Sequence, residues 1–168
     1  MKEILLTQNE VALVDDEDFE KLSIHKWYAY KNSKSNVWYA ARKNLKNDGK
    51  QEMVLMHREL LDATKNIQVD HRNGNGLDNK KENLRLATNQ QNQFNRTYQK
   101  NNNLRIKGVY WCKLMKKFNA RIHINNKRIK LGYFNVLGDA DSAYRIAEEK
   151  YFGVFARAIV EESHSPII

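Results

Sequence analysis

Asp70 and His71 form an acid–base pair directly before a loop rich in glycine and asparagine, and Asn83 and Asn92 follow that loop. Imidazole titrates near neutral pH, so His71 can take a proton from water. The side-chain oxygens of Asp70 and Asn92 are hard ligands that suit Mg²⁺ or Mn²⁺. Together these residue types favour metal-assisted hydrolysis of a phosphodiester, with His71 as the general base.

Each of these residues also has an ordinary structural explanation. An Asp-His pair is commonly surface decoration, and an asparagine-rich loop commonly reflects turn chemistry. The spacing favours the site: His71 precedes Asn83 by 12 residues, and Asn83 precedes Asn92 by 9. Neighbours on a strand point to opposite faces, so Asp70 and His71 can share a site only at a strand end or a distorted turn. The amide of Asn83 can donate and accept, so we expect it to pin the loop.

The segments before this stretch predict small elements that support it. Residues 10–14 predict a strand, and residues 15–22 predict a helix. The acidic residues 15–18 could bind a metal, but a helix start is the favoured explanation, because the helix dipole stabilises acidic residues there. Residues 27–30 and 37–41 predict a strand pair, and residues 53–61 a helix. Thr88 is placed to cap the helix that carries Asn92.

Composition narrows the class of protein. The single cysteine, Cys112, excludes an internal disulfide and a cysteine-based zinc site, which predicts a reducing, cytosolic compartment. No apolar run is long enough to span a membrane, and the first residues lack the features of a signal peptide. Residues 1–95 hold 15 Lys and Arg against 14 Asp and Glu, whereas residues 96–168 hold 14 against 6. The basic second half suits a polyanionic partner, although a merely soluble surface is the alternative.

The C-terminal region predicts a three-stranded sheet packed on one helix. Phe118–Asn125 alternates apolar and polar residues, Asn125-Asn126 is a candidate hairpin turn, and Gly108–Cys112 predicts a further strand. The helix over Asp139–Phe152 has an apolar face that includes Tyr144 and Tyr151. Residues 99–106 have too little apolar content to pack a core, which predicts a linker.

The central motif resembles the HNH endonuclease family, in particular the phage and intron homing endonucleases with a ββα-metal motif. The resemblance rests on Asp70-His71, the glycine-rich residues 73–76, Leu77-Asp78-Asn79, residues 82–85 and Asn92. It implies that His71 is the general base, that Asp70 and Asn92 bind the metal, and that Asn83 is structural. Asn92 stands where many members have His, which disfavours zinc and is the pattern of the nicking homing branch.

Four further residues near the motif are weaker candidates. Met56-His57-Arg58 also fits the resemblance; His57 can join the site or orient phosphate, but packing beside the motif is the favoured explanation. Arg58, Arg85 and Arg96 are candidate phosphate clamps, with solvated surface as the alternative, and Arg85 is favoured because it is close to Asn83.

Residues 107–155 resemble the APETALA2-type DNA-binding domain. Lys107–Trp111, Lys117–Ile122, Lys130–Phe134, Asp139–Tyr144 and Tyr151–Gly153 carry the resemblance. In that family the sheet enters the major groove, and a β-ribbon fits there. Arg121 is the best candidate for bidentate contact with guanine. The expected DNA-binding residues are Lys107, Tyr110, Lys113, Lys117, Asn119, Arg121, His123, Arg128 and Lys130. Tyr110 and Cys112 replace arginine positions of the plant domains, so the target sequence does not carry over.

These observations predict an α+β protein with an HNH endonuclease domain over residues 1–98, a basic linker over 99–106 and an APETALA2-like domain over 107–160. Within the first domain, residues 1–50 form a β-rich support that also touches DNA, and residues 53–98 form the ββα-metal motif. The expected function is site-specific cleavage of double-stranded DNA with Mg²⁺ or Mn²⁺ by a cytoplasmic monomer, encoded by a phage or its bacterial host. The alternatives are a DNA-binding regulator with a vestigial nuclease site and, more weakly, an RNA-binding protein.

Overall fold

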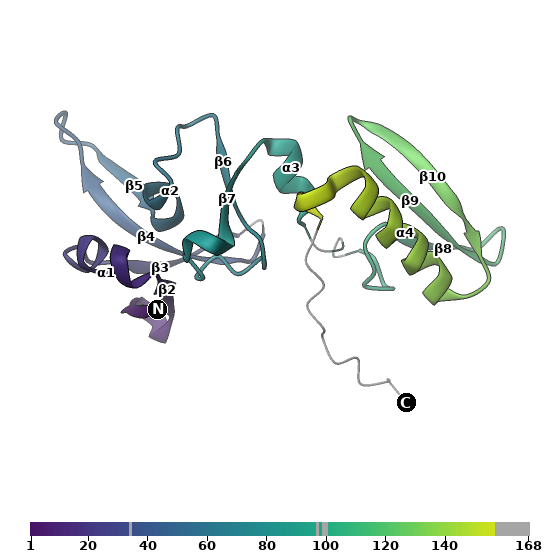
Figure 1. Ribbon diagram of the computed structural model, residues 1–168, viewed down its shortest axis with the longest axis horizontal. Coiled ribbons are helices and arrows are strands. Elements are labelled where there is room, and N and C mark those ends of the chain that lie inside the picture. The colour runs from purple at the N-terminus through teal and green to yellow at the C-terminus, as the bar shows by residue number, and fades with distance from the viewer. Residues whose placement is uncertain (34, 97, 99–100, 157–168) are drawn as a thin grey trace. The chain divides into compact units, whose positions relative to one another are not determined.

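The computed structural model describes residues 1–33, 35–96, 98 and 101–156, which fold into two compact units. The first comprises Met1–Asn92, and the second begins at Gln93. Both combine helices with small antiparallel sheets, so the predicted α+β class is confirmed (Figure 1). No helix within the described ranges has the length and apolar character needed to cross a membrane.

Antiparallel strand pairs form the framework of the first unit. β1 (Lys2–Leu5) pairs with β2 (Val11–Val14), and β4 (Trp38–Leu45) lies between β3 (Tyr28–Lys31) and β5 (Gln51–Leu55). β6 (Gln68–His71) pairs with β7 (Leu84–Ala87). The short helices are η1 (Thr7–Asn9), α1 (Asp16–Ser23), α2 (Met56–Leu60), η2 (Lys81–Asn83) and α3 (Asn89–Phe94).

Two expectations for the first unit have different outcomes. The acidic run before Phe19 does start a helix, since the first turn of α1 holds Asp16, Glu17 and Asp18. The single helix expected over residues 53–61 is wrong at its start. Residues 53–55 complete β5, because they pair in register with Lys43, Arg42 and Ala41 of β4, and α2 begins only at Met56.

The core of the first unit joins the N-terminal elements to the central motif. Leu77, from the loop between β6 and β7, packs in the same cluster as Val14 of β2, Leu22 of α1 and Met56 of α2. The other buried members are Ile4, Ala12, Trp27 and Ala40. The glycine- and asparagine-rich loop is therefore anchored in a hydrophobic core at its C-terminal end.

The second unit is a three-stranded sheet with one helix packed on it. β9 (Lys117–Ile124) lies between β8 (Val109–Cys112) and β10 (Lys127–Phe134), and α4 (Leu137–Phe152) covers the sheet before η3 (Gly153–Phe155). Asn125 and Asn126 join β9 to β10 with φ of 50° and 61°. A two-residue hairpin turn of this type requires a positive φ at both residues, and asparagine adopts this conformation readily.

The core of the second unit differs from expectation at two places. Tyr151 was expected on the buried face of the helix but is 41% exposed, whereas Phe152 is buried. The expected linker also contributes to the core. Among its described residues, 101–106, Leu104 and Ile106 pack against the core. The side chain of the buried Asn102 donates to the carbonyls of Ile106 and Val109. Two well-placed apolar residues and a buried amide therefore suffice to fix this polar segment.

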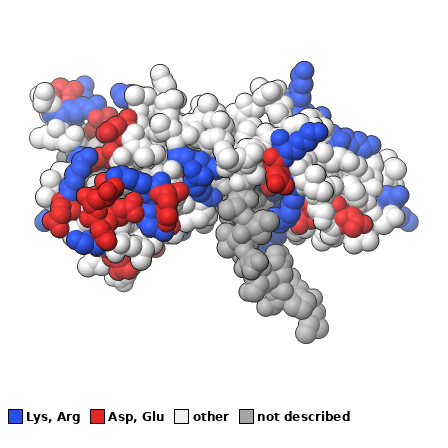
Figure 2. All heavy atoms as spheres, in the orientation of Figure 1, with Lys and Arg blue, Asp and Glu red and all other residues white. Residues whose placement is uncertain are grey.

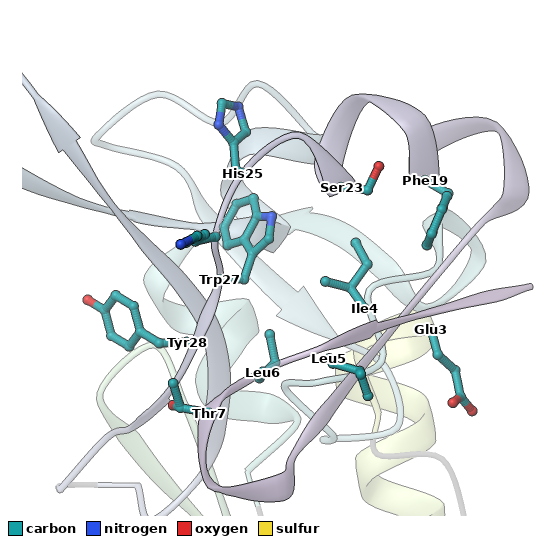
Figure 3. Close-up of a pocket in the computed structure, with 11 residues that line it drawn as sticks. Glu3, Ile4, Leu5, Leu6, Thr7, Phe19, Ser23, His25, Trp27 and Tyr28 are labelled. Atoms are coloured by element: carbon teal, nitrogen blue, oxygen red, sulfur yellow. The ribbon is translucent and has the colours of Figure 1, made fainter.

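A hollow of about 610 Å³ lies beside β1 in the first unit (Figure 3). Ile4, Leu6, Phe19 and Trp27 give it apolar walls, and all of its lining residues fall between Glu3 and Tyr28. The indole nitrogen of Trp27 donates to the carbonyl of Leu22, which fixes one wall. The hollow is thus a feature of the supporting elements rather than of the loop after His71.

Candidate active site

β6 ends with the acid–base pair, and both side chains are buried: Asp70 is 4% and His71 6% exposed. The pairing of β6 with β7 places Asp70 opposite Arg85 and His71 opposite Leu84. Because adjacent strand residues face opposite ways, the two side chains have different neighbours. Asp70 contacts Arg85, whereas His71 contacts Asn79, His57 and Tyr39.

Asn83 closes the loop that follows His71. Its side-chain oxygen accepts from the backbone N–H of Asn73 at 3.1 Å, and its amide nitrogen donates to the carbonyl of Asp78 at 2.7 Å. Its backbone carbonyl accepts from the N–H of Arg72 at 2.9 Å. One buried asparagine therefore ties the beginning of the loop to its end, using both the donor and the acceptor of its amide.

The N-terminal elements buttress the same loop from outside. Leu13 of β2 donates to the carbonyl of Leu77 at 2.9 Å, and its own carbonyl accepts from the N–H of Asn79 at 2.8 Å. On another side, a Cβ added to Gly76 would lie 2.3 Å from the carbonyl oxygen of Trp38 and 2.7 Å from the Tyr39 ring. Glycine is required here because β4 approaches the backbone too closely for any side chain.

Asn79 orients the imidazole of His71. The Oδ1 atom of this fully buried asparagine lies 3.4 Å from His71 Nε2, and its Nδ2 donates to the carbonyl of Leu77 at 3.1 Å. Because Leu77 fixes the amide, Oδ1 must face the ring and can only accept, which assigns the proton to Nε2. In this tautomer Nδ1 is the basic nitrogen of His71. The Asp78-Asn79 dipeptide belongs to the motif, but its sequence alone did not predict this role for Asn79.

A second buried histidine packs against His71. The ring of His57 on α2 lies edge-on to the His71 ring with centroids 4.9 Å apart, and Tyr39 contacts both rings at 5.2 and 5.9 Å. Burial, with His71 and Arg58 nearby, lowers the pKa of His57 to about 3. Burial also lowers the pKa of His71, against the opposing effects of Asn79, Asp70 and Asp78. Both imidazoles are therefore neutral at neutral pH, the state in which His71 can accept a proton.

Two of the three arginines expected to contact phosphate bind groups of the protein itself. The Nε and Nη2 atoms of Arg85 lie 2.7 and 2.6 Å from Asp70 Oδ2, and both side chains are buried. Arg58 donates to the carbonyls of Ala63, Thr64 and Ile67, so it braces the segment that leads to β6. Arg85 and Arg58 thus have structural partners in place of solvent, and only Arg96 is exposed.

Asn92 lies on α3, which follows β7 after a single residue. Thr88 and Gln91 form a capping box: the Thr88 N–H donates to Gln91 Oε1 at 2.8 Å, and the Gln91 N–H donates to Thr88 Oγ1 at 3.2 Å. The side chain of Asn92 is half-buried on the next turn. Among the described residues, no cluster of three or more His, Cys, Asp and Glu could hold a metal. The oxygen donors that could hold a metal here are the carboxylate of Asp70 and the side-chain amide of Asn92, and such donors suit hard divalent cations.

The open face of the β8–β9–β10 sheet carries most of the expected DNA-contacting residues. Val109, Ala120 and Ile122 pack in the core with α4, so the alternate residues Tyr110, Asn119, Arg121 and His123 face the other side. The register adds Arg128 opposite His123 and Lys130 opposite Arg121. A bulge between Lys130 and Gly132 also brings Tyr133 opposite Asn119, a residue that strict alternation could not predict.

Two charged residues on this unit have specific partners. The guanidinium of Arg121 stacks over the Tyr110 ring, 4.2 Å from its centroid. Lys107 was expected to contact phosphate, but its ammonium is 2.6 Å from Oε1 of the buried Glu148 and also donates to the Phe94 carbonyl. Lys107 therefore holds α4 to the segment before β8, and the sequence could not reveal this because Glu148 lies 41 residues away.

Acidic and basic side chains are visible on both units in Figure 2. Acidic and basic side chains intermingle on the first unit in this view. From Asn83 to Gly138 the sequence contains no Asp or Glu, so all three strands of the second unit are free of acidic residues. The sheet face is therefore cationic along its length.

Comparison with known proteins supports a nuclease. Residues 63–94 match the family model described as HNH endonuclease, and the match spans β6, the loop, β7 and α3. Searches of curated proteins and of solved structures gave no match. An HNH nuclease acts on DNA, so DNA is the substrate that this match supports.

Proposed function

We propose that this protein is a site-specific DNA endonuclease of the homing type, in which His71 is the general base and Asp70 and Asn92 hold one Mg²⁺ or Mn²⁺. The observation that carries the proposal is the environment of His71. A buried, neutral imidazole, with Asn79 on its Nε2 side, ends a strand directly before a loop braced by Asn83. An imidazole that is neutral and fixed is the state that general-base catalysis requires.

In the proposed reaction, His71 Nδ1 takes a proton from the water that attacks phosphorus. Asn79 holds the ring from Nε2, and His57 packs against its edge. Asn83 keeps the loop closed, so that the ring orientation survives binding of the DNA strand. A divalent metal at Asp70 and Asn92 would polarise the phosphate and stabilise the leaving oxygen. The contacts of Arg85 fall on Oδ2 of Asp70 and would fix the orientation of that carboxylate.

The second unit is proposed to select the site as an APETALA2-type DNA-binding domain. Its sheet face presents Asn119, Arg121, His123, Arg128 and Lys130, with Lys113 and Lys117 beside it. Arg121 is held by Tyr110, and no hydrogen-bond partner within the described residues is found for Arg121 Nε or Asn119 Oδ1. Arginine and asparagine are the residues that read guanine and adenine in the major groove. Arg121→Ala should loosen site preference in a selection from random duplexes, and unchanged preference would refute this role.

A second function, that of a DNA-binding regulator with a vestigial nuclease site, is favoured by one observation. Asp70, the expected metal ligand, already forms a buried ion pair with Arg85. A nicking assay on a supercoiled plasmid with Mg²⁺, with Mn²⁺ and with EDTA separates the two functions. Metal-dependent nicking supports the endonuclease. Plasmid binding without nicking under any of these conditions supports the regulator.

A further inference from the structure

The turn that joins β8 to β9 exposes large apolar side chains. Leu114 is 90% and Met115 48% exposed at the tip, and Trp111 at the base of the hairpin is 47% exposed. Turns are normally built from Gly, Asn, Asp, Pro and Ser, so leucine and methionine have no conformational reason to occupy these positions. The Trp111 ring packs edge-on against Phe118 with centroids 4.8 Å apart, which gives the hairpin a firm base.

Lysines surround this apolar tip. Lys113 and Lys116 flank Leu114 and Met115 within the turn, and Lys117 begins β9. The absence of Asp and Glu between Asn83 and Gly138 means that no acidic residue of the hairpin opposes a polyanion. The tip also continues the sheet face, because Lys117 has the same strand alternation as Asn119 and Arg121. Apolar side chains flanked by lysines are suited to DNA. The lysines would contact phosphates, and the apolar side chains would contact bases.

We propose that Leu114 and Met115 insert between neighbouring base pairs of the bound duplex and kink it. This inference rests on the proposed DNA binding by the second unit and adds to it a wedge outside the sheet face. Proteins that bind the minor groove commonly insert Leu, Met, Phe or Ile between base pairs, and the insertion partly unstacks the base step and kinks the duplex. The cost of unstacking makes flexible pyrimidine–purine steps the preferred point of entry. The tip would therefore contribute to site choice without hydrogen bonds to bases.

The test uses the full chain and a closed circular plasmid in EDTA, relaxed by a metal-independent topoisomerase. Insertion unwinds the duplex, so the wild-type protein should change the linking number as its occupancy increases. The double variant Leu114→Ser, Met115→Ser should lose this change at equal occupancy while it still binds the plasmid. Ile146→Ser, which removes a 68% exposed apolar side chain from α4, is the matched control and should behave as the wild type.

Three results would overturn the inference. One is a double variant that changes the linking number as much as the wild type at equal occupancy. Another is a wild-type protein that binds the plasmid without changing its linking number. The third is self-association of the DNA-free wild type that the double variant loses, which would assign the tip to a protein interface. A chain that does not bind the plasmid at all would instead refute the proposed DNA binding together with the wedge.

Discussion

Asn79 Oδ1 lies 3.4 Å from His71 Nε2, and both side chains are buried. The same asparagine donates through its backbone N–H to Leu13 and through its side chain to the Leu77 carbonyl. The orientation of the His71 ring is therefore coupled to β2, a strand nearly sixty residues earlier in the chain. This relationship makes the N-terminal region a structural support for the His71 ring.

Asn79→Ala removes the acceptor that fixes the His71 tautomer. We expect kcat for plasmid cleavage to fall by about 10- to 100-fold, part of what a general base contributes, while KM changes little. Stability should fall by about 0.5–1.5 kcal/mol, because the Leu77 carbonyl loses the hydrogen bond from Asn79 and keeps the one from Leu13. Asn75→Ala, an exposed position of the same loop, is the control. Equal loss of kcat in both variants would show that Asn79 acts only through the loop.

Gly76→Ala tests whether β4 holds the loop in place. The new Cβ would collide with backbone of Trp38 and the ring of Tyr39. We expect a loss of about 1–3 kcal/mol in the free energy of unfolding, the usual cost of overpacking, together with reduced cleavage. Gly138→Ala is the control, since nothing lies within 4 Å of its added Cβ. Urea unfolding of both variants gives the comparison, and a Gly76 variant as stable as the wild type would contradict the close packing.

His57 should make the first unit sensitive to acid. Burial, with His71 and Arg58 nearby, lowers its pKa from 6.5 to about 3, so between these values the unfolded chain binds a proton that the folded chain does not. The stabilisation is complete above pH 6.5 and is lost as pH falls, by up to about 1.4 kcal/mol per pH unit. The lowered pKa of His71 acts in the same direction.

The substitution His57→Phe keeps a ring but removes the titrating group. Urea unfolding across this pH range should show a shallower loss of stability in this variant than in the wild type. His25→Phe is a half-buried control in the same unit and should retain the wild-type slope. A wild-type slope in the His57 variant would mean that His57 is not the source of the acid sensitivity.

Lys107 and Lys113 should separate folding from DNA binding. Lys107→Met leaves the buried Glu148 without its ion pair, so the second unit should lose about 3–5 kcal/mol, with the salt dependence of DNA binding unchanged in the protein that remains folded. Lys113→Met at the exposed turn should leave stability unchanged and reduce the slope of log affinity against log salt by about 1. If Lys107→Met instead reduced the salt slope and left stability unchanged, Lys107 would be a phosphate contact.

The sequence predicted those features that local chemistry determines. The acidic start of α1, the Thr88 cap and the Asn125-Asn126 turn each depend on residues within a few positions of one another. The alternation in β9 likewise predicted which residues of the sheet are buried, because one helix covers one face. In the central motif, the amide of Asn83, which can both donate and accept, suggested the loop closure that its hydrogen bonds describe.

Features that depend on distant partners were not predictable in this way. Arg85 is paired with Asp70, and Lys107 with Glu148, through contacts that only the folded chain creates. Leu104 and Ile106 are partly buried against a core formed by β8, β9 and α4. The polar residues around them therefore wrongly predicted a linker. Asn79 was missed for a related reason, since its importance arises from the approach of both β2 and His71.

His71→Ala removes the group that we propose as the general base of a metal-dependent DNA endonuclease. Nicking of a supercoiled plasmid by this variant in Mg²⁺ should fall by at least about 100-fold, the lower range of a general base, while binding to the same plasmid in EDTA remains at the wild-type level. A variant that binds as the wild type does and still nicks at the wild-type rate would contradict the account.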